Sequence, residues 1–258
     1  MLDLTGKNAL VTGIANNRSI AWGIAQQLHK AGANIGVTYL PDEKGKMEKK
    51  VKDLVEPLSP SLFLPCNVQD DDQVNSTYVT IKYIWCSIDI LIHCLAFAKK
   101  DDLTGGFSET SRGGFNLALE ISAYSLALLA GAAKPLMSEG GSIVTLTYLG
   151  GPKAIPNYNV MGVAKAALES SVRYLAAELG EQKIRVNAIS AGPIRTLASS
   201  AVGGSLDMIH LVEQVAPLKR TVTQLEVGNA AAFLSSDLAS GITGQVLYVD
   251  AGYEIMGM

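Results

Sequence analysis

Short apolar runs alternate with longer amphipathic stretches along most of the chain. The apolar runs predict buried strands, because a strand covered on both faces reads as a continuous hydrophobic segment. They occupy residues 8–12, 34–39, 62–64, 88–93, 142–147, 184–189 and 245–249. The amphipathic stretches repeat apolar residues every three or four positions and predict helices at residues 20–31, 43–56, 70–85, 110–137 and 157–179.

This alternation predicts an α/β fold. We expect a Rossmann-type, doubly wound parallel sheet of about seven strands with helices on both faces. No linker, charge block or repeat divides the sequence, which indicates a single domain. Open sheets of this kind bind ligands beyond the carboxyl ends of their strands, so the segments just after each strand are the candidate site.

Composition narrows the classes of function. Hydrophobic residues make up 48% of the chain and charged residues 17%, which excludes a disordered protein. The formal net charge of −3 argues against a dedicated nucleic-acid binder, whose affinity depends on neutralising phosphates. No uninterrupted apolar run reaches the roughly 18 residues of a membrane span. The first residues also lack the basic and apolar regions of a secretory signal.

The cysteines and histidines give no reason to expect a disulfide or a metal. Cys66, Cys86 and Cys94 form no CxxC pair, which fits a reducing cytosolic compartment. The three histidines lie far apart in the sequence and lack the spacing of zinc ligands. We therefore expect no metal site.

The segment after the first predicted strand has residues that suit a phosphate group. Gly13 permits a tight backbone turn, and Ser19 places a hydroxyl at the start of the next helix. The free N–H groups and the positive end of the helix dipole attract anions there. The strict GxGxxG pattern is absent, however, and an ordinary turn with a serine N-cap explains this segment equally well.

Residues after the second and third strands indicate which dinucleotide fits. No arginine or lysine follows Tyr39 directly to meet a 2′-phosphate, which favours NADH over NADPH. Arg18 and Lys44 lie close enough in the sequence to leave NADPH open. Asn67 follows the third strand, and its amide can pair with adenine, although a polar turn residue is an equally good interpretation.

Two tyrosines and a lysine form a candidate catalytic set. Tyr158 and Lys165 are seven positions apart in a predicted helix, nearly two turns, so they share a face. Tyr148 follows a strand on the ligand side of the sheet. A nearby ammonium favours the phenolate form of a tyrosine, and a phenol can stabilise charge that develops on a carbonyl oxygen. Two amphipathic aromatic residues and a snorkelling lysine would give the same pattern.

The wider match decides between these interpretations. The matching segments are Gly13 with Ser19, residues 93–98 (HCLAFA), Tyr148, residues 158–165 (YNVMGVAK) and residues 191–196 (AGPIRT). Together they resemble the enoyl-[acyl carrier protein] reductases of type II fatty acid synthesis, a divergent branch of the short-chain dehydrogenase/reductase superfamily. The similarity runs from Leu4 to about Val249. Its distinguishing mark is the Tyr-x6-Lys spacing, since ordinary superfamily members have Tyr-x3-Lys and would carry tyrosine where Met161 stands.

The resemblance implies hydride transfer from NADH to the β-carbon of a trans-2-enoyl thioester carried by acyl carrier protein, the last reductive step of fatty acid elongation. It assigns Tyr158 to stabilisation of the enolate and Lys165 to the nicotinamide ribose. Tyr148 would line the pocket, either assisting protonation or packing on the acyl chain. The implied substrate contacts are Phe97, Ala98, Tyr148, Tyr158 and Met161, of which Phe97 and Met161 are equally consistent with core packing. The implied cofactor contacts are Gly13, Ser19, Ile20, Leu40, Asn67, Val68, Leu95, Lys165, Ile194, Arg195, Thr196, Leu197 and Ala198.

The resemblance also implies a homotetramer in the cytoplasm of a bacterium, or in the plastid stroma for a mature organellar form. Residues 1–258 would form one dinucleotide-binding and catalytic domain with a mobile lid at about residues 196–212. Gly203 and Gly204 disfavour a helix over residues 199–207, because each glycine costs about 1 kcal/mol relative to alanine.

Two alternatives remain. A carbonyl reductase of the same superfamily needs a tyrosine four residues before Lys165, and Met161 argues against it. A nicotinamide-sensing regulator with an inactive site belongs to a different class of function. The presence of Tyr158 and Lys165 argues against that reading.

Overall fold

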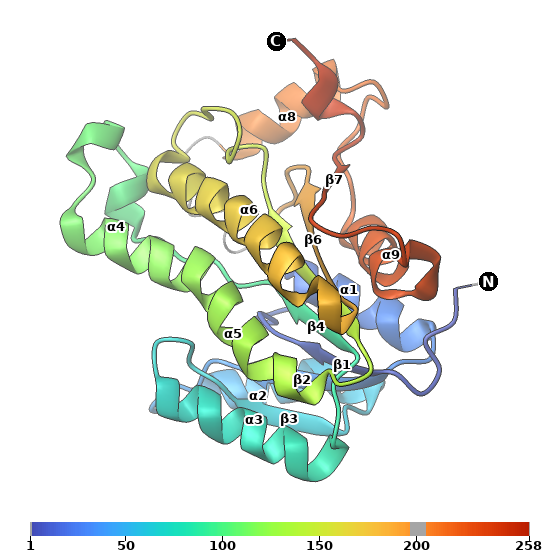
Figure 1. Cartoon of the computed structure of the whole chain (residues 1–258). Helices are drawn as coiled ribbons and strands as arrows, with labels where there is room; N and C mark the ends of the chain where they lie inside the picture. Colours follow the sequence, from blue (N-terminus) through green and yellow to red (C-terminus); the bar gives the residue numbers. More distant parts are fainter. Residues whose placement is uncertain (1, 197–204, 258) are drawn as a thin grey trace.

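The computed structural model describes residues 2–196 and 205–257 of the chain. Seven parallel strands form one sheet in the order β3-β2-β1-β4-β5-β6-β7, which confirms the predicted architecture (Figure 1). The strands are β1 (Asn8–Val11), β2 (Asn34–Tyr39), β3 (Leu62–Pro65), β4 (Ile90–His93), β5 (Gly141–Thr147), β6 (Ile184–Ala191) and β7 (Val246–Val249).

The sheet reverses its direction of growth at β1. This strand pairs with β2 on one side and with β4 on the other, so the chain builds outward to β3 and then returns across β1. The connections that follow β1 and β4 therefore diverge, and a crevice opens at the carboxyl edge of the sheet between them.

Helices cover both faces of the sheet. They are α1 (Ile20–Lys30), α2 (Lys46–Val55), α3 (Asp71–Trp85), α4 (Arg112–Leu119), α5 (Ser125–Ala133), α6 (Asn159–Leu179), α8 (Ser205–Val215) and α9 (Gln224–Ser235). Val11 packs into the layer that contains α1, α2 and α9, whereas its neighbour Leu10 packs into the layer of α3, α5 and α6. The alternation follows from the period of two along a strand, and it explains why the strand sequences are apolar throughout.

The predicted helix at residues 110–137 is not one regular helix. A π-helical segment at Glu120–Tyr124 separates α4 from α5, and a 3₁₀ turn at Lys134–Leu136 ends the stretch. The stretch Arg112–Leu136 is 25 residues long and contains an 18-residue segment with a mean hydropathy of 1.4, so by length and composition it could cross a membrane. Polar and charged residues such as Asn116 and Glu120 interrupt it, so it contains no uninterrupted apolar run of that length. In the structure, residues such as Leu126 and Leu129 pack in the core against the sheet, and 39% of the 18-residue segment is buried.

Two helices were not predicted from the sequence. Helix α9 begins at a capping box, in which the Thr223 hydroxyl accepts from the N–H of Glu226 and the Glu226 carboxylate accepts from the N–H of Thr223. Helix α8 begins at residue 205, so the expectation of non-helical chain was wrong for residues 205–207. The remainder of that expected loop, residues 199–204, lies outside the described residues.

Helices α1 and α9 approach each other through glycines. A methyl group on Gly228 would lie 2.6 Å from the carbonyl oxygen of Gly23, in contact with rigid backbone. We expect Gly228→Ala to lower the free energy of unfolding by about 1–3 kcal/mol through overpacking. Urea unfolding measures the change. Gly113→Ala in α4 is the matched control, because open space surrounds that position. An equal effect of the two substitutions would contradict the packing argument.

Candidate active site

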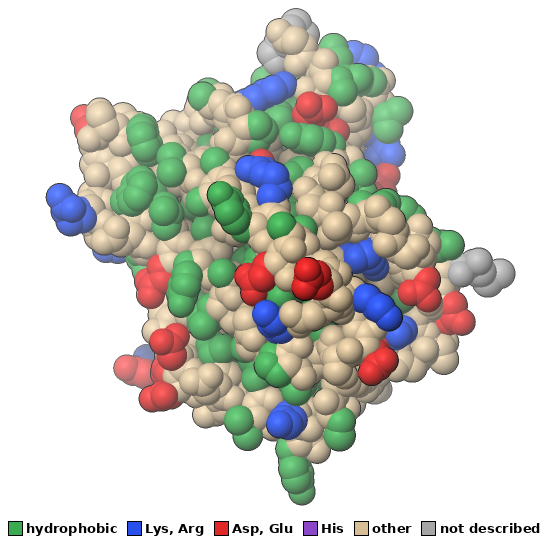
Figure 2. Space-filling model, viewed as in Figure 1, with side chains coloured by type: hydrophobic (Ala, Val, Ile, Leu, Met, Phe, Trp, Pro, Cys, Tyr) green, Lys and Arg blue, Asp and Glu red, His purple; other side chains and the backbone are tan. Residues whose placement is uncertain are grey.

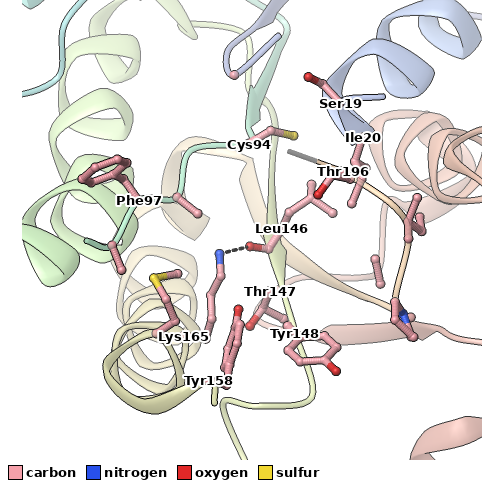
Figure 3. A pocket seen from close by; sticks show the side chains of 18 of the residues that line it. Ser19, Ile20, Cys94, Phe97, Leu146, Thr147, Tyr148, Tyr158, Lys165 and Thr196 are labelled. Atoms are coloured by element: carbon pink, nitrogen blue, oxygen red, sulfur yellow. Dashed lines mark hydrogen bonds between the residues drawn. The ribbon is translucent and has the colours of Figure 1, made fainter. Parts of the chain in front are cut away.

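A cavity of about 520 Å³ opens at the carboxyl edge of the sheet. Its walls come from the segments that follow β1, β4, β5 and β6, together with α6 and α8 (Figure 3). These are the strands around the reversal point, so the topology itself brings distant parts of the sequence to one place.

The loop after β1 forms the upper end of this cavity. Gly13 has a φ of 88°, and a methyl group there would collide with the carbonyl oxygen of Cys94. The Ser19 hydroxyl accepts hydrogen bonds from the N–H groups of Ala15 and Asn16 at 3.0 and 3.1 Å. Ser19 is the N-cap residue of α1, as the sequence indicates, but its side chain makes no capping bond to the helix. Because two N–H groups donate to the Ser19 oxygen, the O–H proton of Ser19 can be donated to an anion.

Tyr148 and Tyr158 face each other across the lower part of the cavity. Their ring centroids lie 4.9 Å apart, and the rings meet edge to face at 68° (Figure 3). Tyr158 immediately precedes α6 rather than lying inside it, because Asn157 takes the left-handed conformation and the helix starts after it. Burial raises the pKa of Tyr148 to about 12 and that of Tyr158 further. Both phenols are therefore hydrogen-bond donors at neutral pH, and the expected shift toward phenolate does not occur.

Lys165 is buried in the cavity wall, with 5% of its surface exposed. Its ammonium group donates to the carbonyl oxygen of Leu146 at 2.7 Å, the bond drawn in Figure 3. Burial lowers the pKa of Lys165 to about 8, and the negative charge of Glu169 opposes that shift. Glu169 lies one turn further along α6 and accepts from the Thr147 hydroxyl at 2.6 Å. The ammonium thus bonds to a strand carbonyl oxygen and lies in the field of a carboxylate one helical turn away.

Most of the predicted site residues meet in this cavity. Its lining includes Gly13, Ser19, Ile20, Leu95, Phe97, Ala98, Tyr148, Tyr158, Met161, Lys165, Ile194 and Thr196. The sequence did not single out several further apolar lining residues, among them Leu103, Ile155, Pro156, Met208 and Ile209. Single apolar residues in loops and at a helix start carry no periodic signal, so only the three-dimensional structure reveals them.

The remaining predicted cofactor residues lie outside this lining. Leu40 and Asn67 follow β2 and β3 on the same edge of the sheet, and the Asn67 side chain accepts from the N–H of Gln69 at 3.1 Å. Val68 packs beside the core layer of α3. Arg195 is exposed. Leu197 and Ala198 lie outside the described residues.

Comparison with known proteins identifies relatives along the whole chain. The family model described as Enoyl-(Acyl carrier protein) reductase matches residues 13–254. A protein of Nostoc named enoyl-[acyl-carrier-protein] reductase [NADH] FabI is 81% identical over the full length of both chains. A protein of the same name from Synechocystis is 72% identical, also over the full length of both.

Solved structures agree with this match. The Bacillus cereus enoyl-acyl carrier protein reductase, solved with NADP+ and an indole naphthyridinone, superposes with a TM-score of 0.96 at 52% identity. The match covers 100% of both chains. The NADH enoyl-[acyl-carrier-protein] reductase of Aquifex aeolicus gives a TM-score of 0.95 at 44% identity and covers 99% of each chain.

The depressed pKa of Lys165 predicts a specific pH dependence of stability. The unfolded lysine titrates near 10.5 and the folded one near 8, so between these values the unfolded chain binds more protons. The free energy of unfolding of the wild type should therefore rise between pH 8 and 10.5 relative to that of Lys165→Met, which lacks this group. Urea unfolding of both proteins across this range measures the difference. If the difference between the two free energies of unfolding stayed constant with pH, the proposed lowering of the Lys165 pKa by burial would be wrong.

Proposed function

This chain belongs to the enoyl-(acyl carrier protein) reductase family. From that premise we propose how the residues of its cavity promote reduction of the trans-2 double bond of enoyl groups on acyl carrier protein by NADH. One observation carries the proposal. Tyr158 and Lys165 converge on a cavity that also holds the Gly13 turn, while Met161 occupies the position where a carbonyl reductase of the superfamily would carry its tyrosine.

The upper end of the cavity fits a dinucleotide. Gly13 lets the loop after β1 pack against the Cys94 carbonyl oxygen, with which any side chain would collide, and the first turn of α1 offers N–H groups that suit a phosphate. The Ser19 hydroxyl has a proton to donate there. When bound, NADH supplies the hydride that adds to the β-carbon of the substrate. We assign Ile20, Leu95, Ile194 and Thr196 to the walls of this end, with Leu40, Asn67 and Val68 at the adenosine end.

Tyr158 stabilises the negative charge that develops on the thioester oxygen. Its raised pKa keeps the phenol protonated, so its O–H donates to the enolate oxygen without first losing its proton. Lys165 binds ribose hydroxyls, and its ammonium keeps the local potential positive while the enolate forms. Tyr148 holds the Tyr158 ring edge to face and lines the substrate side of the cavity.

The acyl chain occupies the apolar part of the cavity. Phe97, Ala98 and Met161 line it together with Met208 and Ile209 of α8. The position of α8 over the cavity supports a lid function for residues 196–212, of which residues 197–204 lie outside the described residues. The substrate is presented by acyl carrier protein.

The surface supports assembly into a homotetramer. An apolar groove between α3 and α5 includes Val74, Tyr124 and Leu128, and 56% of the Tyr124 surface is exposed. Apolar side chains are visible over α4 and α5 in Figure 2. Acidic and basic side chains are interspersed on this face. The face therefore lacks the basic stripe that is typical of nucleic-acid-binding proteins. The cyanobacterial relatives support a bacterial cytoplasmic location.

A paired substrate assay tests the function. Crotonyl and acetoacetyl thioesters are each offered with NADH and then with NADPH, and oxidation is followed by the absorbance of the reduced nicotinamide. We expect oxidation of NADH with the crotonyl substrate only. Oxidation with the acetoacetyl substrate alone would make the protein a carbonyl reductase. No oxidation with either, while the cofactor still binds, would favour a nicotinamide sensor.

Tyr158→Phe tests the assignment of the enolate donor. Removing one such donor typically lowers kcat by about 100-fold or more. We expect that loss with crotonyl thioester, with unchanged NADH affinity by fluorescence titration. Tyr83→Phe is the control. Tyr83 lies on α3, is 88% exposed and does not belong to the cavity lining. Full activity of Tyr158→Phe would show that another group stabilises the enolate.

A further inference from the structure

The π-helical segment Glu120–Tyr124 lies beside the cavity and takes no part in the mechanism described above. Such segments are rare and occur frequently at functional sites. Ser122 lies in the middle of this segment and is fully buried. A buried hydroxyl needs polar partners, so its contacts reveal what the irregular turn accomplishes.

Ser122 joins two walls of the cavity. Its hydroxyl oxygen accepts from the backbone N–H of Phe97 at 3.0 Å and lies 3.2 Å from the carbonyl oxygen of the same residue. The same hydroxyl lies 3.7 Å from the sulfur of Met161 in α6. Phe97 and Met161 are both lining residues of the apolar part of the cavity. One side chain therefore fixes the loop after β4 relative to α6.

A second serine anchors the segment to the sheet. Ser125 donates to the carbonyl oxygen of Ile121 at 2.6 Å, so its oxygen accepts from Nε2 of His93 at 2.8 Å. The other ring nitrogen of His93, Nδ1, then accepts from the Thr145 hydroxyl at 2.7 Å. His93 is the last residue of β4 and precedes Phe97 by four positions. The segment is thus fixed to β4, to β5 and to the loop that β4 leads into.

The other end of the cavity is held by different bonds. Ser19 is bound by its own loop, and Lys165 is bound by the Leu146 carbonyl oxygen. Neither bond involves the π-helical segment. A change at Ser122 therefore acts directly on the apolar wall and breaks neither of the bonds that hold Ser19 and Lys165.

We propose that Ser122 is a positioning residue that sets the shape of the acyl-binding wall and thereby the selectivity for acyl chains. The irregular turn is needed because it brings Ser122 to Phe97 and Met161 while Ser125 meets His93. The proposal rests on the proposed function, since it assigns the apolar wall to the acyl chain of an enoyl thioester.

Ser122→Ala tests the proposal. The variant leaves the Phe97 N–H without its hydroxyl acceptor and frees the wall to move. We expect the KM for a long substrate, trans-2-octenoyl thioester, to rise about tenfold, the equivalent of about 1.4 kcal/mol. The KM for NADH and the turnover of crotonyl thioester should stay unchanged. Ser171→Ala is the matched control, because that hydroxyl bonds to the Ala167 carbonyl oxygen of its own helix.

A purely structural role for Ser122 would give a different pattern. Destabilisation alone lowers the active fraction, so turnover of both substrates would fall together while every KM stayed constant. That pattern, or an unchanged KM for the octenoyl substrate, would overturn the proposal. Ser122→Cys keeps the size of the side chain with a weaker hydrogen-bonding group, and an intermediate KM is expected from it even where the alanine variant does not fold.

Hydrogen exchange separates this proposal from the proposed function. The Phe97 amide should be protected in the wild type and exchange faster in Ser122→Ala, without any substrate present. An inactive wild type with this loss of protection would refute the reductase function and keep the positioning role of Ser122. An active wild type with unchanged protection in the variant would refute the positioning role alone.

Discussion

The hydrogen bond from the Lys165 ammonium to the Leu146 carbonyl oxygen is the interaction on which the site depends. A charged group loses several kcal/mol of solvation on burial unless polar partners compensate. Here the partner is a backbone carbonyl near the end of β5, which can accept because the sheet places it at the edge of the cavity. The lysine is available to a ligand only because α6 is docked firmly on that strand, through buried residues such as Leu168 and Val172.

The site therefore keeps polar groups in an apolar setting. Burial lowers the pKa of Lys165 to about 8 and raises that of Tyr148 to about 12. Each shift records that the folded protein disfavours the ionised form, and ribose hydroxyls or a developing enolate would supply the missing partners. This arrangement costs stability and gives reactivity, the usual relation between a site and its scaffold.

The sequence allowed the sheet to be predicted because its determinants are local. Buried parallel strands such as Asn34–Tyr39 read as continuous apolar runs, and their order along the chain fixes the edge at which the site forms. The Tyr158 and Lys165 pair was also readable, since a spacing of seven positions brings the residue ahead of α6 and a residue of α6 to the same cavity. Helix α9 was missed although Thr223 begins a capping box, because its alanine-rich sequence buries too many faces to show a single apolar stripe.

Other features depend on contacts that no local pattern encodes. Ser19 occupies the N-cap position that the sequence indicates, but its hydroxyl accepts from its own loop and does not cap the helix. Nothing in the sequence around Ser122 marks a π-helical turn, because that geometry is selected by Phe97, Met161 and His93 in distant segments. The pKa of Lys165 likewise depends on how completely the fold removes water.

The position of Met161 shows how one scaffold distinguishes two reductions. In a carbonyl reduction the hydride and the developing charge belong to one C–O bond, whereas in an enoyl thioester the charged oxygen lies further from the carbon that takes the hydride. Tyr158 stands three residues before Met161 and immediately ahead of α6, so the phenol enters the cavity from the start of the helix. In the proposed function this phenol serves the thioester oxygen. Met161 packs with Leu103 and Val160 and lies 3.7 Å from the Ser122 hydroxyl, so the position that would carry the carbonyl donor supplies apolar cavity wall here.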